Sequence, residues 1–204
     1  MSVLVINCNH WIGYHIVNTL LNHDYLVEGI ESEIEHDDLS MFFGRNSSFS
    51  FYNKEEMKRY DTCICVGDYE HMETIHADRI IMINPQKSYR KLNPDSITTL
   101  LASHLFGEWM PMTEKGYYRN QEFIAFQSNE FIENAIYIED FSERLIHCLQ
   151  SGNLPSNIEV KSEHSNGKES KENGDSIYIC SSLQLEQRMT ALQKQYQLIK
   201  EKNK

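Results

Sequence analysis

The first thirty residues place a short apolar run directly before a helical pattern. Residues 3–6 are aliphatic and mostly β-branched, and the run stops at the polar stretch 7–10, Asn-Cys-Asn-His. Apolar residues then recur at helical spacing over 11–22, and a second strand-like run covers 25–30. A strand that leads through a tight turn into a helix, and then into another strand, predicts a βαβ unit of a parallel sheet.

The same alternation continues along the first half of the chain. Further strand-like runs cover 49–52, 62–66, 79–83 and 97–101, separated by polar or helix-compatible stretches. This order predicts a Rossmann-like, doubly wound parallel sheet of the α/β class. The chain has 204 residues, which suits a truncated version of that fold with one main core.

We expect three segments within this fold. Residues 1–153 form the Rossmann-like domain, with a loop-rich cleft wall after residue 101. Residues 154–175 are rich in Ser, Asn, Gly, Lys and Glu, which predicts a mobile polar loop. Residues 176–204 supply a last strand and a C-terminal helix that complete the same domain.

Charge and hydropathy exclude several classes of partner. Asp and Glu number 30 against 19 Lys and Arg, a formal net charge of −11, so the chain repels nucleic acid and anionic lipid. The apolar runs are far shorter than the roughly 20 residues that span a bilayer. No export signal precedes the first strand, so we expect a cytoplasmic protein. The five cysteines are typical of reduced core thiols, and we expect no metal site.

The stretch around the first turn resembles the TGxxGxxG motif of the extended short-chain dehydrogenases, the NAD-dependent epimerase/dehydratase family. Other stretches resemble later elements of that family in the same order: 27–31, 61–67, 105–111, 137–141 and 177–180. The resemblance implies a Rossmann-like fold in a shortened and degenerate form. It also implies a vestigial nucleotide site made of Asn7, His10, Trp11, Ile12, Gly13, Glu31 and Gly67, in which Glu31 stands for the ribose-binding acid.

The three glycines of that motif have different tasks. The first makes the tight turn, the second lets the pyrophosphate approach the backbone, and the third packs the helix on the strand. Here these positions hold Asn7, His10 and Gly13. Asn tolerates a positive φ, so the fold is expected to survive, whereas the imidazole of His10 would stand where the phosphates come closest. We therefore expect no cofactor, and NAD or NADP only if the chain is an atypical enzyme.

Catalysis in the family depends on a Tyr-x-x-x-Lys pair, whose members share one helix face. Tyr89 is followed by Lys91 at the wrong spacing, and the literal match, Tyr196 with Lys200, falls in the last helix. The family's catalytic serine or threonine corresponds to Asn84. About a dozen residues separate the strands at 79–83 and 97–101, too few for the family's active-site helix.

Two hypotheses of function follow. The first is a non-catalytic Rossmann-fold scaffold or regulatory binding protein. The alternative is an atypical NAD(P)-dependent nucleotide-sugar epimerase, dehydratase or reductase with relocated catalytic groups, for which Tyr89, Tyr117 and His104 are the candidates.

The C-terminal helix carries an apolar stripe with spacings of 4, 3, 4 and 3: Leu185, Met189, Leu192, Tyr196 and Ile199. Such a stripe can pack on its own domain or against a partner helix. We expect self-packing over 185–192, and a protein partner or self-association through the rest.

Overall fold

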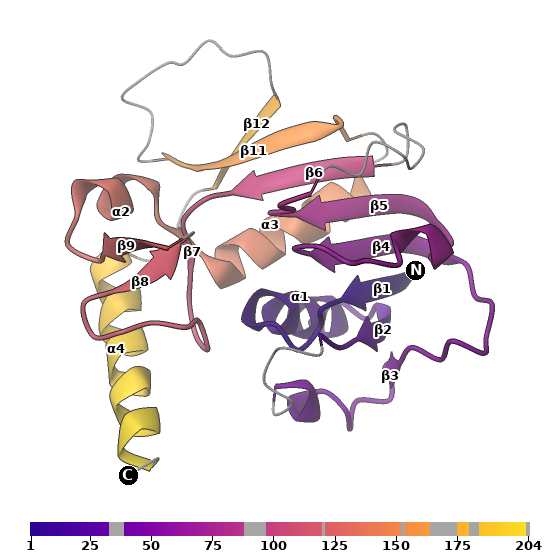
Figure 1. Cartoon of the computed structure of the whole chain (residues 1–204), viewed down its shortest axis with the longest axis horizontal. Helices are drawn as coiled ribbons and strands as arrows, with labels where there is room; N and C mark the ends of the chain where they lie inside the picture. The colour runs from indigo at the N-terminus through magenta and orange to yellow at the C-terminus, as the bar shows by residue number, and fades with distance from the viewer. Residues whose placement is uncertain are drawn as a thin grey trace.

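The computed structural model describes residues 1–32, 39–87, 97–119, 121–151, 154–163, 175–179 and 184–202. Its centre is an eight-stranded sheet with the order β12-β11-β6-β5-β4-β1-β2-β3 (Figure 1). The strands are β1 (Ser2–Ile6), β2 (Leu26–Ile30), β3 (Phe49–Phe51), β4 (Tyr60–Val66), β5 (Ala77–Ile83), β6 (Ile97–Ala102), β11 (Asn157–Ser162) and β12 (Asp175–Ile179). All neighbouring strands pair in parallel, so the predicted Rossmann-like sheet is confirmed.

The remaining elements of the described residues are four α-helices, two 3-10 turns and four short strands. The helices are α1 (Trp11–Asn22), α2 (Asn129–Asn134), α3 (Ile138–Gln150) and α4 (Leu185–Lys202), and the 3-10 turns are η1 (Ser40–Phe42) and η2 (Met72–Thr74). The short strands form two pairs, a parallel one of β7 (Leu105–Phe106) with β10 (Ile136–Tyr137) and a hairpin of β8 (Gly116–Arg119) with β9 (Glu122–Ala125).

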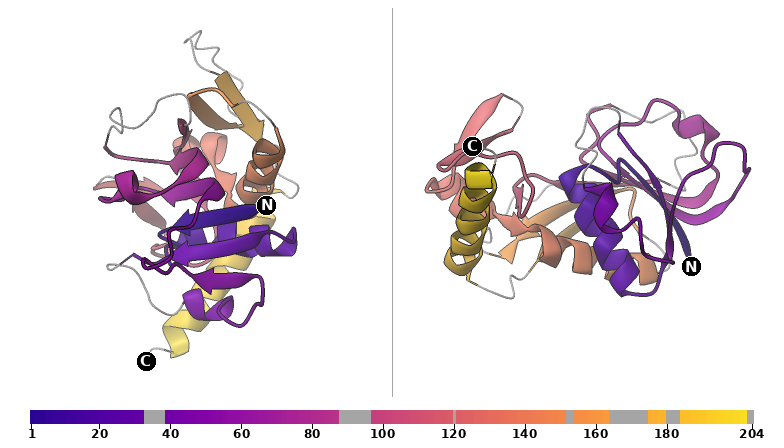
Figure 2. Two further views of the ribbon diagram at one scale, coloured as in Figure 1. Left: turned by 90° about the vertical axis from the view of Figure 1, so that its right-hand side faces the viewer. Right: turned by 90° about the horizontal axis from the view of Figure 1, so that it is seen from below.

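The two faces of the sheet are covered unequally. Helices α1 and α3 contact each other and lie along one face, as Figure 2 shows, where they pack on Val3 and Val5 of β1. The alternate residues of β1, Leu4 and Ile6, belong to a second core cluster on the opposite face. There the connection from β4 to β5 contains the short turn η2, whose Met72 is buried against the strands. One face thus carries two long helices, and the central strands of the other carry a thin cover.

The segment from β7 to α2 gathers at the end of the sheet toward which the parallel strands point (Figure 1). Aromatic rings hold it together, because Phe131 of α2 contacts Phe106, Tyr117 and Phe126 at centroid distances of 5.4, 6.2 and 5.2 Å. This unit stands beside the carboxyl edge of the sheet, where the sequence predicts a cleft wall.

The expectation of a loop over 154–175 is wrong for its first part. Residues 157–162 form β11, which pairs with β6 on one side and β12 on the other. Ile158 and Val160 are buried while Asn157 and Glu159 are exposed. This alternation was present in the sequence, but the charged residues between the apolar ones masked it. The stretch 164–174 lies outside the described residues.

Helix α4 is anchored at its N-terminal half. Leu192 is buried, and Leu185 and Met189 pack against the main core, which confirms the expected self-packing over 185–192. The guanidinium of Arg188 lies 3.8 Å from the ring centre of Tyr137, a cation–π contact. A partner for the rest of the stripe stays a prediction, since the side chain of Ile199 lies outside the described residues.

Within the described ranges, no helix is long and apolar enough to cross a membrane, and no group of His, Cys, Asp and Glu side chains is placed to hold a metal ion. The thiols of Cys8, Cys63, Cys65 and Cys148 are free and buried. Burial raises the pKa of Cys8 to about 12, so this thiol is unreactive at neutral pH.

Gly13 gives the first prediction, because a Cβ at this position would overlap the carbonyl oxygen of Asn7. We expect Gly13→Ala to lower the free energy of unfolding by about 2 kcal/mol or more, although alanine is the better helix former. Urea denaturation measures this. Gly44→Ala is the control, since a Cβ there meets only an ordinary contact with Ser40. Equal stability of both variants would contradict the close approach of α1 to β1.

Candidate functional site

The predicted nucleotide site lies at the carboxyl ends of β1 and β4. In the sheet, β1 has β2 on one side and β4 on the other, so the strand order reverses between β1 and β4. Helix α1 begins directly after the turn at 7–10, which places its N-terminus at this edge. In open α/β sheets, ligands bind in the crevice outside the carboxyl ends of the strands at such a reversal.

Asn7 takes the turn position with a φ of 60°, as expected for a residue that tolerates the left-handed region. Its side-chain Nδ2 donates to the carbonyl oxygens of Val66 at 2.7 Å and Asp68 at 3.2 Å. A glycine could not make these bonds. The substitution therefore keeps the turn and also ties it to the end of β4.

Asn9 is a site residue that the sequence analysis missed. It is fully buried, its Oδ1 accepts from the backbone amide of Ser32 at 2.7 Å, and its Nδ2 donates to the carbonyl of Ser32 at 3.0 Å. The turn is thereby bonded to the segment after β2, next to Glu31. The sequence showed a polar stretch, but not which strand end would lie beside it.

His10 is the N-cap of α1. Its Nδ1 accepts a hydrogen bond from the backbone amide of Ile12 at 3.1 Å. The first amides of a helix are the groups that bind phosphate in this fold, because they point out of the helix and carry its positive partial charge. The imidazole therefore lies at the position where a cofactor's phosphates would approach the chain.

The other predicted site residues divide into two groups. Gly67 has a φ of 72° and open space where a side chain would be, and Glu31 is exposed just past the end of β2. The side chains of Trp11 and Ile12, in contrast, are only 9% and 7% exposed and belong to the main core. Only the backbone groups of these two residues are therefore placed to contact a ligand at the edge.

A second group of polar side chains lies past the carboxyl end of β6. The Nδ1 of His104 is 3.2 Å from the hydroxyl of Tyr117, and Arg119 approaches the Nε2 of His104 at 2.8 Å. Arg119 also pairs with Glu130 of α2 at 3.0 Å. The structure thus brings together two of the three residues predicted for relocated catalysis, while Tyr89 lies outside the described residues.

The protonation of this group follows from its donors. Arg119 can only donate, so Nε2 of His104 accepts, and the proton on Nδ1 points to the oxygen of Tyr117. Burial and the neighbouring guanidinium lower the pKa of His104, so its imidazole is neutral at pH 7. Burial raises the pKa of Tyr117 to about 12. His104 also lines a hollow of about 200 Å³ shared with Glu159 of β11.

Asn84 occupies the end of β5, where the resembling family has its catalytic hydroxyl. Its Nδ2 donates to the carbonyl of Ala102 at 2.9 Å, and its Oδ1 accepts from the amide of Ala102 at 2.8 Å. Its φ is 48°. Both polar atoms of the amide join the ends of β5 and β6, so Asn84 has a structural role.

Comparison with known proteins gives matches in structure only. No protein-family model matches the chain, and no curated protein sequence matches it. The yeast methylglyoxal/isovaleraldehyde reductase Gre2 complexed with NADPH is similar with a TM-score of 0.60 at 14% identity, over 98% of this chain and 99% of that one. Vestitone reductase from alfalfa is similar with a TM-score of 0.52 at 10% identity, over 78% and 76% of the two chains.

These likenesses show a fold shared with Rossmann-fold reductases, one of which was solved with NADPH. That finding contradicts the expectation of no cofactor, which is therefore wrong. The expectation rested on the imidazole of His10, which does lie at the N-terminus of α1, where its Nδ1 accepts from the Ile12 amide. The turn and the start of the helix beside it are nevertheless kept. Asn7 keeps the backbone conformation, and α1 still begins at the sheet edge.

The neutral His104 predicts a pH dependence of stability. The unfolded chain takes up a proton near the ordinary histidine pKa of about 6.5, and the folded chain does so only at lower pH. Stability should therefore fall as pH is lowered from about 7.5 to 5.5. His104→Gln should show a smaller fall in urea denaturation, whereas exposed His147→Gln should keep the wild-type fall. If the free energy of unfolding of His104→Gln fell with pH as steeply as that of wild type, the lowered pKa of His104 would be contradicted.

Proposed function

We propose that the chain binds a nicotinamide dinucleotide at the carboxyl ends of β1 and β4 and acts through this binding, as a scaffold or regulatory protein without hydride transfer. The NADPH held by the yeast reductase supports the choice of ligand. The observation that carries the proposal is the turn at 7–10, which keeps a positive φ at Asn7 and places the N-terminus of α1 at the edge. Bound NADPH would supply a hydride in a catalytic relative.

Each part of the edge has a task in this proposal. The first-turn amides would face the phosphates, and the imidazole of His10, which occupies the Ile12 amide, would lie beside them and weaken this contact. Glu31, exposed after β2, would face the ribose hydroxyls, and the open space at Gly67 would admit the adenosine. The side chains of Asn7 and Asn9 hold the turn from beneath through their bonds to Val66 and Ser32.

The absence of hydride transfer is supported at Asn84. A catalytic hydroxyl at the end of β5 must be free to bond a substrate, whereas both polar atoms of this amide bond the backbone of Ala102. The short connection from β5 to β6 also leaves little room for a helix with a Tyr-x-x-x-Lys pair. Regulation by a cytoplasmic protein partner, contacted through Tyr196 and Ile199 of α4, remains part of the proposal.

A second candidate is an NAD(P)-dependent reductase whose catalytic groups have moved. The contact between His104 and Tyr117 favours it, because a phenol bonded to a neutral imidazole is a plausible acid for a carbonyl substrate. Against it, both residues are only 6% exposed, and the high pKa of the phenol makes it a poor proton donor at neutral pH.

The binding proposal predicts the effect of the His10 side chain. Calorimetric titration with NADPH should give a measurable Kd, and His10→Gly should bind about tenfold more tightly, because the Ile12 amide is then open to phosphate. Ser128→Gly is the matched control: it removes the N-cap of α2 and should leave the Kd unchanged. Failure of both wild type and His10→Gly to bind at millimolar NADPH would overturn the proposal.

The two candidates differ in turnover. We expect no oxidation of NADPH when wild-type protein is mixed with methylglyoxal, isovaleraldehyde or a nucleotide sugar and the cofactor's absorbance is followed. The reductase alternative instead requires turnover that falls at least about a hundredfold in Tyr117→Phe. Tyr118→Phe, at the exposed neighbouring position, should leave that turnover intact. Turnover with this pattern would replace the scaffold proposal.

A further inference from the structure

A pocket of about 580 Å³ lies on the thinly covered face of the sheet. Its walls come from two segments, 52–60, which leads from β3 to the first residue of β4, and 69–76 between β4 and β5. The second segment crosses the sheet with one 3-10 turn, so its buried residues Met72 and Ile75 reach the strands while space remains beside them. A volume of this size accommodates a small organic molecule. The pocket shares no lining residue with the edge at 7–13.

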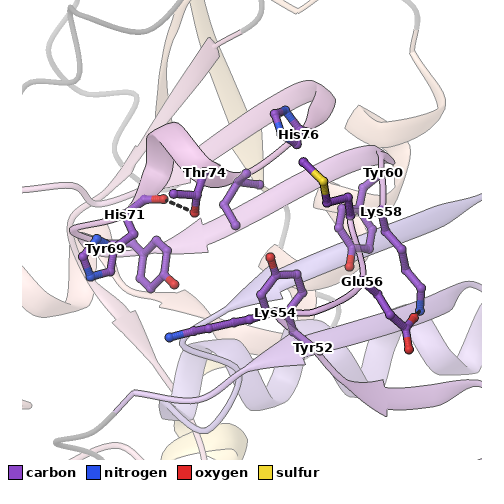
Figure 3. Close-up of a pocket in the computed structure, with 11 residues that line it drawn as sticks. Tyr52, Lys54, Glu56, Lys58, Tyr60, Tyr69, His71, Thr74 and His76 are labelled. Atoms are coloured by element: carbon purple, nitrogen blue, oxygen red, sulfur yellow. Dashed lines mark hydrogen bonds and ion pairs between the residues drawn. The ribbon is translucent and has the colours of Figure 1, made fainter.

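Three tyrosine rings form much of the wall. Tyr52, Tyr60 and Tyr69 come from different parts of the two segments and line the same pocket, as Figure 3 shows. Tyr60 is 3% exposed and donates its hydroxyl proton to Glu28 at 2.7 Å, which holds its ring in place. The ring of Tyr69 also contacts His71 in an edge arrangement, with centroids 6.0 Å apart. Such walls suit a flat aromatic ring, which stacks on or against their faces.

The two lysines at the pocket differ in whether their ammonium groups are already paired with carboxylates. The ammonium of Lys58 is bonded to Glu28 at 2.7 Å and to Glu56 at 2.8 Å, so it is neutralised within the protein. Lys54, in contrast, forms no ion pair with any residue that the structure describes, and its side chain extends along the pocket in Figure 3. One cation beside aromatic walls favours a ligand with one negative group. A doubly charged phosphate fits less well, because the chain as a whole carries a net charge of −11.

We propose that this pocket binds a planar aromatic molecule with a single carboxylate, whose ring lies among Tyr52, Tyr60 and Tyr69 and whose carboxylate pairs with Lys54. The site is separate from the nucleotide edge and does not depend on the proposed cofactor. It exists because the connection from β4 to β5 contains a short turn where a long helix would have covered the strands.

Three indole probes with one ring and different side chains test the charge: indole-3-acetate, the neutral indole-3-acetamide, and the cationic tryptamine. Titrated into the full chain without NADPH, the acetate should bind about tenfold more tightly than the acetamide, and tryptamine should bind most weakly. Lys54→Met should raise the Kd of the acetate about tenfold and leave that of the acetamide unchanged. Lys54 is exposed, so this variant should fold normally.

Two further variants test the role of the aromatic wall and the position of the binding site. Tyr69→Leu should weaken the acetate and the acetamide alike, and Lys194→Met, an exposed lysine on α4, should change neither. Equal affinity for all three probes, tightest binding of tryptamine, or no binding of the acetate at millimolar concentration would overturn the proposal. Displacement of the acetate by NADPH would do so too, because it would place the acid in the nucleotide site.

Discussion

Helix α1 lies on the carboxyl end of β1 with no side chain between them at Gly13, and this contact positions the rest of the edge. A Cβ at Gly13 would overlap the carbonyl of Asn7, so the helix could not start where it does. With the helix in place, the side chain of Asn7 reaches the end of β4, and Asn9 reaches Ser32 after β2. The turn is bonded to both neighbouring strands, so it holds its shape without the two other glycines.

The two faces of the sheet are covered unequally, and this difference determines where the pocket lies. On the face of α1 and α3, long helices pack on the strands and bury Val3 and Val5 of β1. On the opposite face, a short segment with Met72 and Ile75 performs the same task for the central strands. It buries the apolar strand residues but leaves the pocket between Tyr52 and Tyr69. The short connection from β4 to β5 thus leaves space for a pocket on this face of the sheet.

Much of the fold could be predicted because the strands of a buried parallel sheet are apolar runs, and helices repeat at their own period. The strand and helix that flank residues 7–10 were recognised in this way. The strand at 157–162 was not, because an edge region of a sheet tolerates charged residues on its solvent side, and Glu159 hid the pattern of Ile158 and Val160. The conclusion about the cofactor was wrong because it was drawn from the bulk of the His10 side chain alone, although the turn at Asn7 and the start of α1 are kept.

The sequence by itself determined the order of the first strands and of helix α1, the parallel sheet and the position of the first turn, because these depend on local periodicity and on neighbouring residues. Only the tertiary structure decided which side chains meet. His104 and Tyr117 come into contact, Asn9 bonds to Ser32, and the three tyrosines surround one pocket. Each of these contacts joins segments that become neighbours only when the sheet folds. The separation of two residues along the chain does not reveal whether their side chains are close in space.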